Sequence, residues 1–536
     1  MYRNTFGAVF SKRAAISFFV IMILFFTCIL RVAAVALTDY SAVLKKQSSL
    51  RLSAGTLRGT VYDRNMVPLT NTEFEIVAAV SPTPRAVTAI SGILEGEELE
   101  RVLERLKSGK PALCVLPREV ECDGIAVTKV YRRNTAGTPA VHLVGYTDSD
   151  GHGVSGIERA YDDSLYSDSK VSFVYTTDGA GCLLYGIAPE IENDSSVTAS
   201  GVVSTIDVNI QNAAEKAAKD IEYGAVIVAD AKSGKILAAV SRPDFDCSKV
   251  ADYLGNDGSP LLNRALAAYN VGSVFKPCVA AAGIENGYGD FTHNCTGSSF
   301  IVDRVFKCHK RSGHGFMTLK SGLANSCNTF FYNYAIKIGG DKIYNTASAL
   351  GFGKSLKVCD GLYTAAGSLP ERESLSNTAF LANFSIGQGR LSVSPISMLT
   401  LYCAIASDGA YYIPSAVEGT VSGGSFKEYD RGSRTRVMSA ETADTLKKYL
   451  AAVIDEGTGT EARPETVTAA GKTATAQTGK FENGREICEG WFCGFFPAEN
   501  PKYTVIVFSE NTAKQTASCG KIFSGLADRI TSFNFE

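Results

Sequence analysis

A long uncharged segment near the N-terminus constrains this chain more than any other feature of its sequence. Arg3, Lys12 and Arg13 precede it, and no charged residue occurs in the seventeen positions from Ala14 to Leu30. A helix of that length spans about 25 Å, close to the bilayer hydrocarbon core of about 30 Å. The apolar run can continue to Leu37 if the Arg31 guanidinium reaches the interface. We predict a transmembrane anchor over residues 14–37.

The flanking charges also predict an orientation. Basic residues gather on the cytoplasmic side of membrane helices, so residues 1–13 are expected in the cytoplasm and the rest of the chain outside the cell membrane. The alternative is a cleaved signal peptide, because Ala34-Val35-Ala36 has the small-x-small form of a cleavage site. The apolar run exceeds the usual length of about 7–15 residues in a signal peptide, which favours an uncleaved single-pass anchor.

Charge and length narrow the function classes. A chain of 536 residues predicts two or more domains. Lys and Arg number 53 and Asp and Glu number 55, so the net charge of -2 offers no electrostatic reason to expect a nucleic-acid partner. We predict that the chain binds no nucleic acid.

Fourteen cysteines are many for an exported protein, and no C-x-x-C pair occurs among them. With Cys28 in the membrane, thirteen remain outside, so at least one must stay unpaired or bond another chain. A cluster of candidate ligands has irregular spacing, so we predict no metal centre. The sequence allows two states for Cys295 and Cys308, a disulfide between them or two buried thiols. The candidate ligands are Cys295, Cys308, His309 and His314.

The residue pattern changes near residue 200. Before it, β-like runs at 59–64 and 74–80 alternate with a charged helical stretch at 95–109. After it, residues 207–222 have the period of an amphipathic helix, with Asp207 suited to the N-cap. A hairpin, three later strands and a closing helix follow, with mostly helical sequence between the hairpin and those strands. Their ranges are 225–231, 236–240, 468–477, 490–496, 503–509 and 521–533. This order predicts an α+β fold with a five-stranded antiparallel sheet, flanking helices and a helical subdomain.

Three short motifs carry the chemistry. Ser273-Val-Phe-Lys276 opens a helix, Ser326-Cys327-Asn328 lies in a helical region, and Lys472-Thr473-Ala474 lies on a late strand. S-x-x-K also begins at Ser167 and at Ser518, and S-x-N also begins at Ser532, so order and context must discriminate.

On a helix, residues i and i+3 share a face, so Lys276 can reach the Ser273 hydroxyl. A serine needs a base to become nucleophilic, and a lysine becomes that base when burial or nearby positive charge lowers its pKa. Lys472 is a candidate for that second charge. Gly272 allows a close approach to the helix start, where free N–H groups face a developing oxyanion.

These motifs and their surroundings resemble the class B penicillin-binding proteins. Segments with this resemblance extend over most of the chain from about residue 50, including the stretches around all three motifs, although Val271 stands where proline is common. The segments are 58–65, 153–165, 205–217, 263–277, 313–335, 383–411, 469–480 and 490–507. The resemblance implies an N-terminal dimerisation or pedestal domain of mixed α+β structure over 38–200 and a transpeptidase domain over 201–536.

It also implies a peptidoglycan D,D-transpeptidase whose Ser273 is acylated by a stem peptide or by a β-lactam, and which requires no cofactor. In the family's scheme, Lys276 accepts the serine proton and Ser326 relays a proton between Lys276, Lys472 and the leaving amine. Asn328 holds Lys276 and the substrate backbone. Lys472 and Thr473 bind the substrate carboxylate, and the N–H groups of Ser273 and Thr475 form the oxyanion hole.

One position departs from the family's pattern, because Ala474 stands where Gly is usual. A methyl group there is expected to narrow the cleft and weaken β-lactam acylation without abolishing activity.

Other functions share these motifs. A serine β-lactamase or antibiotic sensor would not need the region 50–200, a D,D-carboxypeptidase would use water as acceptor, and a scaffold for a cell-wall polymerase would need no nucleophile. A bifunctional class A enzyme is disfavoured, since the region before residue 200 is too short for a glycosyltransferase domain. The resemblance implies a multi-pass membrane glycosyltransferase as partner, and the sequence does not distinguish division, elongation and sporulation roles.

Overall fold

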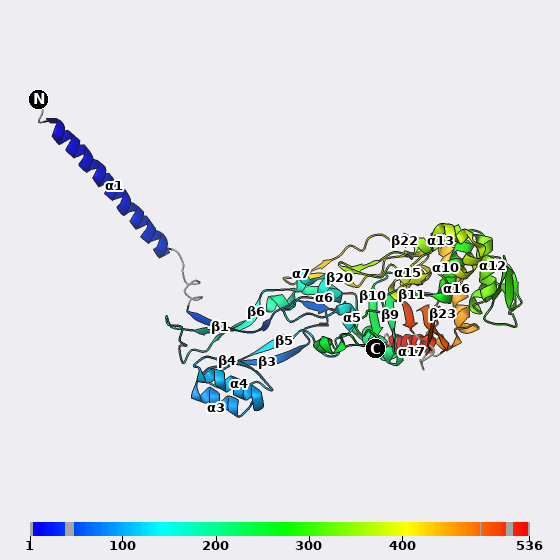
Figure 1. The fold of residues 1–536 in the computed structure, drawn as a ribbon, viewed down its shortest axis with the longest axis horizontal. Coiled ribbons are helices and arrows are strands. Elements are labelled where there is room, and N and C mark those ends of the chain that lie inside the picture. The colour runs from blue at the N-terminus through cyan, green and yellow to red at the C-terminus, as the bar shows by residue number, and fades with distance from the viewer. Residues whose placement is uncertain (1–3, 38–47, 483, 511–517, 534–536) are drawn as a thin grey trace. The chain divides into compact units, whose positions relative to one another are not determined.

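The computed structural model describes residues 4–37, 48–482, 484–510 and 518–533, and Figure 1 shows their ribbon. The chain divides into two compact units that interleave along the sequence. The first holds residues 1–55, 75–130 and 170–193, and the second holds 56–74, 131–169 and 194–536. The predicted region 38–200 thus supplies segments to both units, and its limits as a domain stay a prediction.

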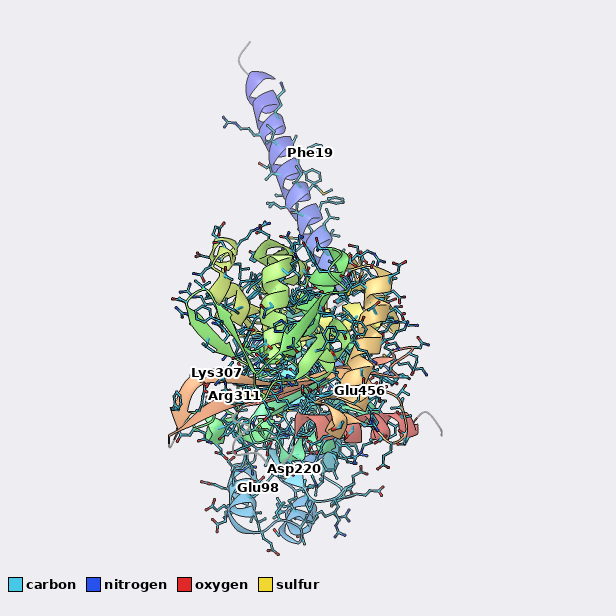
Figure 2. All side chains as sticks on the ribbon, turned by 90° about the vertical axis from the view of Figure 1, so that its right-hand side faces the viewer. Phe19, Glu98, Asp220, Lys307, Arg311 and Glu456 are labelled. Carbon is cyan, nitrogen blue, oxygen red and sulfur yellow. The ribbon has the colours of Figure 1, made fainter. Side chains whose placement is uncertain are left out.

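Helix α1 (Asn4–Leu37) contains the apolar segment. Its part from Lys12 to Leu37 is 26 residues long and apolar enough to cross a membrane. Large apolar side chains stand exposed along it, as Phe19 does in Figure 2, with 68% of its surface accessible. The predicted tail 1–13 is helical from Asn4, and residues 1–3 lie outside the described part.

Two small sheets and helices α3 and α4 follow α1 in the described residues of the first unit. Strands β4, β3 and β5 form one sheet, and β1, β6 and β7 form the other. The apolar faces of α3 and α4 pack on β3 and β4, where Val102, Leu106 and Ile90 are buried. The bounds are β1 Ser49–Thr56, β3 Glu73–Val80, α3 Pro84–Ser91, α4 Gly96–Lys107, β4 Ala112–Leu116, β5 Ile125–Arg132, β6 Lys170–Thr176 and β7 Glu190–Glu192.

The second unit is built on the predicted five-stranded sheet, in the order β10-β9-β25-β24-β23 with every neighbouring pair antiparallel. The sequence prediction of this sheet is confirmed. Strand β9 lies inside the sheet, and its side chains are buried on both faces, which explains its continuous apolar run. The bounds are β9 Gly224–Asp230, β10 Ile236–Arg242, β23 Ala470–Glu482, β24 Arg485–Phe496 and β25 Tyr503–Ser509.

Alternate residues of these strands enter different cores. Ile227 packs on the side of helices α10, α12 and α15, whereas Val226 packs on the side of α9 and α17. Asp207 caps α9 by accepting from the N–H groups of Asn209 and Ile210, as predicted, but α9 ends at Ala217, before a short 3₁₀ turn. The bounds are α9 Val208–Ala217, α10 Lys276–Glu285, α12 Asn328–Ile338, α15 Pro395–Ala406 and α17 Cys519–Ser532.

Between β10 and β23 lie the helical subdomain and several two-stranded ribbons, which Figure 1 draws in green to orange. Their bounds are η2 Cys247–Tyr253, β11 Tyr269–Asn270, η3 Gly272–Phe275, β12 Thr292–Cys295, β13 Ser298–Ile301, β14 Arg304–Lys307, β15 Gly315–Thr318, α11 Leu319–Ala324, α13 Gly340–Ala349, β16 Lys357–Cys359, β17 Leu362–Tyr363, η4 Arg372–Ser376, α14 Thr378–Ser385, β18 Ser392–Val393, β19 Ala410–Tyr411, β22 Thr435–Arg436, α16 Ala440–Asp455 and η5 Thr460–Ala462.

A four-stranded sheet in the order β2-β8-β20-β21 and four short helices also belong to the second unit. Their bounds are β2 Thr60–Tyr62, α5 Val141–Val144, α6 Gly156–Ala160, α7 Asp162–Leu165, α8 Ser195–Ala199, β8 Gly201–Ser204, β20 Val417–Ser422 and β21 Ser425–Glu428.

Candidate active site

The first motif lies on a tight turn. Ser273 is half-buried in the 3₁₀ turn η3, and Lys276 is the first residue of α10, so both belong to one continuous helical segment. Gly272 has φ +58°, and a Cβ atom there would lie 3.2 Å from the Cα of Ala476 on β23. Gly272 also donates its N–H to the carbonyl of Gly387 at 3.0 Å. The missing side chain therefore lets the nucleophile turn contact the third-motif strand directly.

Lys276 joins the first and second motifs. Its Nζ donates to the Ser326 carbonyl at 2.7 Å, to Ser326 Oγ at 3.1 Å and to Asn328 Oδ1 at 2.8 Å. The side chain has no accessible surface, and its Nζ lies 5.2 Å from the centre of the Phe331 ring. In the described residues the hydrogen bonds of Nζ reach the second motif and not the Ser273 hydroxyl. The lysine thus links the first motif, to which it belongs, to the second.

Burial changes the acidity of both lysines. Desolvation lowers the pKa of Lys276 to about 7, while the nearby Cys327 and Cys308 thiols act in the opposite direction. Lys472 is also fully buried, and burial together with the charge of Lys276 lowers its pKa well below the usual value. The electrostatic interaction between the two ammonium groups brings the third motif into the same site. Two buried lysines close together favour a neutral amine on one of them.

The third motif lies on the edge strand β23. Lys472 points into the same core as α10 and donates to the carbonyl of Thr473 at 3.0 Å. Thr473, Ala474 and Thr475 line a cavity of about 420 Å³ that does not include Ser273 or Lys276 in its wall. Thr473 Oγ1 lies 3.0 Å from Thr458 Oγ1. The remaining residues of the wall are Thr458, Gly459, Glu461, Ala462, Gly490, Trp491, Ser518, Cys519, Gly520 and Lys521.

Three further residues support this site, and the motif patterns did not predict them as site residues. Tyr402 on α15 is fully buried and donates its hydroxyl to the carbonyl of Val274 at 3.1 Å, inside the nucleophile turn. Thr458 contacts Thr473, as described above. Trp491 is buried and donates Nε1–H to the Asn270 carbonyl at 2.8 Å. A tyrosine in the mostly apolar helix 395–406 was the only signal for Tyr402.

The copies of the motifs at Ser167, Ser518 and Ser532 have local structural roles. Ser518 caps α17 by accepting from the Lys521 N–H, and Ser167 accepts from the Ser169 N–H. Ser532 donates to the Arg529 carbonyl within the last turn of α17. Position in the fold therefore distinguishes Ser273 from the other serines that begin a motif-like sequence.

The cysteines near the second motif are thiols in the structure. Three of the four candidate ligands named from the sequence, Cys295, Cys308 and His314, lie close together in the structure. The fourth residue of this group is Cys327 instead of His309. Cys327 is the middle residue of the second motif, so this cluster touches the catalytic candidates.

Comparison with known proteins identifies the family. Residues 224–528, more than half of the chain, match the model of the penicillin-binding protein transpeptidase domain. Stage V sporulation protein D of Bacillus subtilis is 28% identical over 491 residues, which cover 85% of this chain and 74% of that protein. The peptidoglycan D,D-transpeptidase MrdA of Acinetobacter baumannii is 24% identical over 528 residues, which cover 85% of this chain and 77% of that protein.

Solved structures agree on the fold. Penicillin-binding protein 3 of Mycobacterium tuberculosis, in complex with aztreonam, superposes with a TM-score of 0.66 at 24% identity, covering 91% of this chain and 97% of that one. The transpeptidase domain from Eggerthella lenta superposes with a TM-score of 0.64 at 23% identity, covering 90% and 98%. The predicted fold class is confirmed, and the chain belongs to the penicillin-binding protein transpeptidase family as a class B penicillin-binding protein.

Proposed function

We propose that this chain is a peptidoglycan D,D-transpeptidase with Ser273 as its nucleophile. The observation that carries the proposal is the buried Lys276, which begins the helix after the Ser273 turn and is hydrogen-bonded to Ser326 and Asn328. A lysine with a pKa of about 7 is neutral in part at physiological pH and can accept a proton.

In the proposed first half-reaction, Ser273 Oγ attacks the carbonyl carbon of the penultimate D-Ala of a stem peptide and gives its proton to Lys276 Nζ. The oxyanion accepts hydrogen bonds from the N–H groups of Ser273 and Thr475, a placement supported by the contact between Gly272 and Ala476. The C–N bond then breaks, and the departing D-Ala amine receives the proton through Ser326.

In the second half-reaction, the amine of another stem peptide attacks the ester carbonyl. As the new amide bond forms, the amine gives its proton to Lys276 through Ser326. The ester C–O bond then breaks, and Lys276 returns the proton to Ser273 Oγ. Lys472, Thr473 and Ala474 border the substrate carboxylate in this proposal, which is supported by the close approach of the nucleophile turn to strand β23.

Helix α1 is long and apolar enough to serve as a single-pass membrane anchor. We propose that its N-terminal end is cytoplasmic, because Arg3, Lys12 and Arg13 precede the apolar segment, and that the second unit is extracytoplasmic. A multi-pass glycosyltransferase of the cell-wall machinery is the proposed partner, which copurification from cross-linked membranes would test.

The decisive test of the nucleophile uses the full chain in detergent. After treatment with penicillin, intact mass spectrometry should show one adduct, and peptide mapping should place it on Ser273. Ser273→Ala should abolish the adduct, whereas Ser167→Ala, which alters another S-x-x-K copy, should leave it unchanged. An adduct on another residue, or labelling of Ser273→Ala at the wild-type rate, would refute the assignment.

Product analysis separates the related reactions. With a synthetic stem peptide and a supplied amine acceptor, a transpeptidase forms the new amide, while a carboxypeptidase releases only the hydrolysed acid. A β-lactamase would turn over penicillin rapidly instead of holding the acyl-enzyme. Formation of the cross-linked product with a long-lived penicillin adduct is the expected outcome.

A further inference from the structure

Four potential metal ligands converge beside the second motif. The Sγ atoms of Cys295, Cys308 and Cys327 and one ring nitrogen of His314 all lie within 4.8 Å of one another. The three cysteines are buried, with at most 2% of their surface accessible, and His314 is half-buried. They come from separate places in the fold: the end of β12, the residue after β14, the residue before β15 and the N-cap of α12.

The spacing between these atoms matches tetrahedral zinc. With Zn–S bonds of about 2.3 Å and Zn–N bonds of about 2.0–2.1 Å, a tetrahedron places sulfur and nitrogen ~3.5 Å apart and two sulfurs ~3.8 Å apart. In the structure, His314 Nδ1 lies 3.5 Å from both Cys295 Sγ and Cys308 Sγ, and Cys308 Sγ lies 4.0 Å from Cys327 Sγ. Three thiolates and one imidazole form one of the usual structural zinc ligand sets.

The backbone around the cluster is shaped to bring the ligands together. Gly313 has φ +82°, and a Cβ atom there would lie 2.3 Å from the Cys295 carbonyl oxygen. Gly297 has φ +93°, and a Cβ atom there would lie 2.0 Å from the Arg311 carbonyl oxygen. The two glycines thus allow the segments carrying Cys295 and Cys308 to pack against each other. The exposed side chains of the same segment include Lys307 and Arg311, labelled in Figure 2, so the charged groups face solvent and the thiols face inward.

We propose that Cys295, Cys308, His314 and Cys327 bind one structural Zn²⁺ that holds the second motif in place. Four protein ligands complete the coordination, so the ion has no open position for substrate or water and does no chemistry itself. The sequence alone predicted no metal here, because the spacings of 13, 6 and 13 residues follow no familiar zinc pattern. Cys327 also lies inside the Ser-Cys-Asn motif, which predicts a catalytic role for its neighbours and no metal ligand.

The site has a direct consequence for Lys276. Cys327 stands between Ser326, which has φ +52°, and Asn328, and Lys276 Nζ donates to both of those neighbours. A left-handed backbone at a serine costs about 1–2 kcal/mol, so the surroundings must hold it. A metal bond to the intervening Cys327 would fix this turn. The positioning part of the inference depends on the proposed acylation of Ser273, whereas the metal site itself does not.

The test uses the full chain in detergent, purified without a metal-affinity step. Inductively coupled plasma mass spectrometry should find about one zinc per chain in wild type and in Cys359→Ser, a buried cysteine outside the cluster. Cys295→Ser and Cys308→Ser should lose most of it. Ser273→Ala should keep its zinc, so failure of the proposed catalytic role and failure of the metal site are distinguishable.

Two measurements on the wild-type protein test the metal site without any cysteine variant, since such a variant can fail to fold. Mapping under non-reducing conditions should find all three cysteines of the cluster unpaired, and Co²⁺ exchange should give the intense thiolate charge-transfer and tetrahedral d–d absorption of a Cys-rich site. Absence of zinc after growth in zinc-supplemented medium, or a disulfide between any two of these cysteines, would overturn the site.

The positioning role is measured separately. Removing the ion with a thiol-reactive mercurial followed by dithiothreitol and a chelator should lower the penicillin acylation rate about 100-fold, because a small misplacement of a catalytic group has an effect of that size. Restoring Zn²⁺ should recover the rate. Unchanged acylation in the zinc-free protein would overturn the positioning role while leaving the nucleophile assignment intact.

Discussion

At the scale of single residues, burial determines the chemistry of Lys276. An exposed lysine with a pKa near 10.4 would be charged at neutral pH and unable to accept a proton from serine. The complete burial of Lys276 lowers its pKa to about 7, and its hydrogen bonds to Ser326 and Asn328 hold the amine in one place. The same residue would be an ordinary surface charge on an exposed helix.

This burial predicts how acylation depends on pH. Below its pKa Lys276 is protonated and cannot act as the base, so the acylation rate should fall about tenfold per pH unit below pH ~7 and level off above it. Stopped-flow measurement of penicillin acylation from about pH 5.5 to 8.5 checks this. Lys276→Arg keeps the charge at every accessible pH and should remove the plateau. A rate that is constant or rises towards acid would contradict the assignment.

Ala474 is the residue at which this chain departs from the family's third motif. Only 8% of its surface is accessible, and its position borders the 420 Å³ cavity. We expect Ala474→Gly to raise the second-order rate constant of penicillin acylation several-fold, since the methyl group narrows the entrance along β23.

The matched control is Ala470→Gly, which removes a buried methyl group from the same strand at a point outside the cavity wall. It should lower thermal stability without raising the acylation rate. Equal acylation kinetics in wild type and Ala474→Gly would show that the methyl group does not limit β-lactam access.

At the scale of elements, the site depends on the close approach of three backbone segments. The nucleophile turn η3 lies between β23 and the 387–389 turn, and Gly272 and Gly387 have no side chain to separate them. Gly387 has φ +73°, and a Cβ atom there would lie 2.0 Å from the Gly272 carbonyl oxygen. The Gly387-Gln388-Gly389 sequence is therefore a tight turn beneath the nucleophile.

A pair of glycine substitutions separates contact from backbone strain. Gly387→Ala should lower the acylation rate about 100-fold, because the new methyl group must displace the nucleophile turn. Gly389 has a left-handed backbone, φ +89°, like Gly387, but the methyl group of Gly389→Ala would contact nothing within 4 Å. It should cost about 1–2 kcal/mol of stability and leave acylation nearly unchanged. Stopped-flow acylation and melting curves of both variants provide the comparison, and equal acylation in the two would exclude the contact explanation.

At the scale of the whole molecule, segments from the first 200 residues belong to the same compact unit as the catalytic elements. A buried ionic cluster connects several of them. Glu158 accepts from Arg58 at 2.8 Å and pairs with Arg133 at 2.5 Å, and Arg58 also pairs with Asp162 at 2.7 Å. Glu158 has only 1% of its side-chain surface accessible. Breaking such a cluster leaves an uncompensated charge in a dry interior.

Glu158→Gln is therefore expected to destabilise the second unit by about 3–5 kcal/mol. The measurement is a melting curve by differential scanning calorimetry, in which the transition of this unit should fall by several degrees. Glu98→Gln, in the exposed Arg101–Glu98 pair on α4, is the control and should change stability by no more than about 1 kcal/mol. A shift no larger than that of the control would show that the Glu158 cluster contributes little.

Much of the fold could be predicted because its signals are local. Apolar residues in α9 recur at helical spacing, and the continuous apolar runs of β9 and β25 indicate strands buried on both faces. The apolar helix α1, long enough to span a membrane, follows from composition alone. The three motifs could be recognised as well, because each is a few adjacent residues in a fixed order.

What the sequence by itself determined was thus the strands of the central sheet, the long apolar N-terminal segment and the family. The family resemblance implied that Lys276 works with Ser326 and Asn328. Only the tertiary structure decided that Lys276 and Lys472 are fully buried, and that Cys327 joins Cys295, Cys308 and His314. The physical reason is that periodicity reports on neighbours two to four residues apart. Contacts across 50 or more residues, and the desolvation that changes a lysine's pKa, arise only when separate elements pack together.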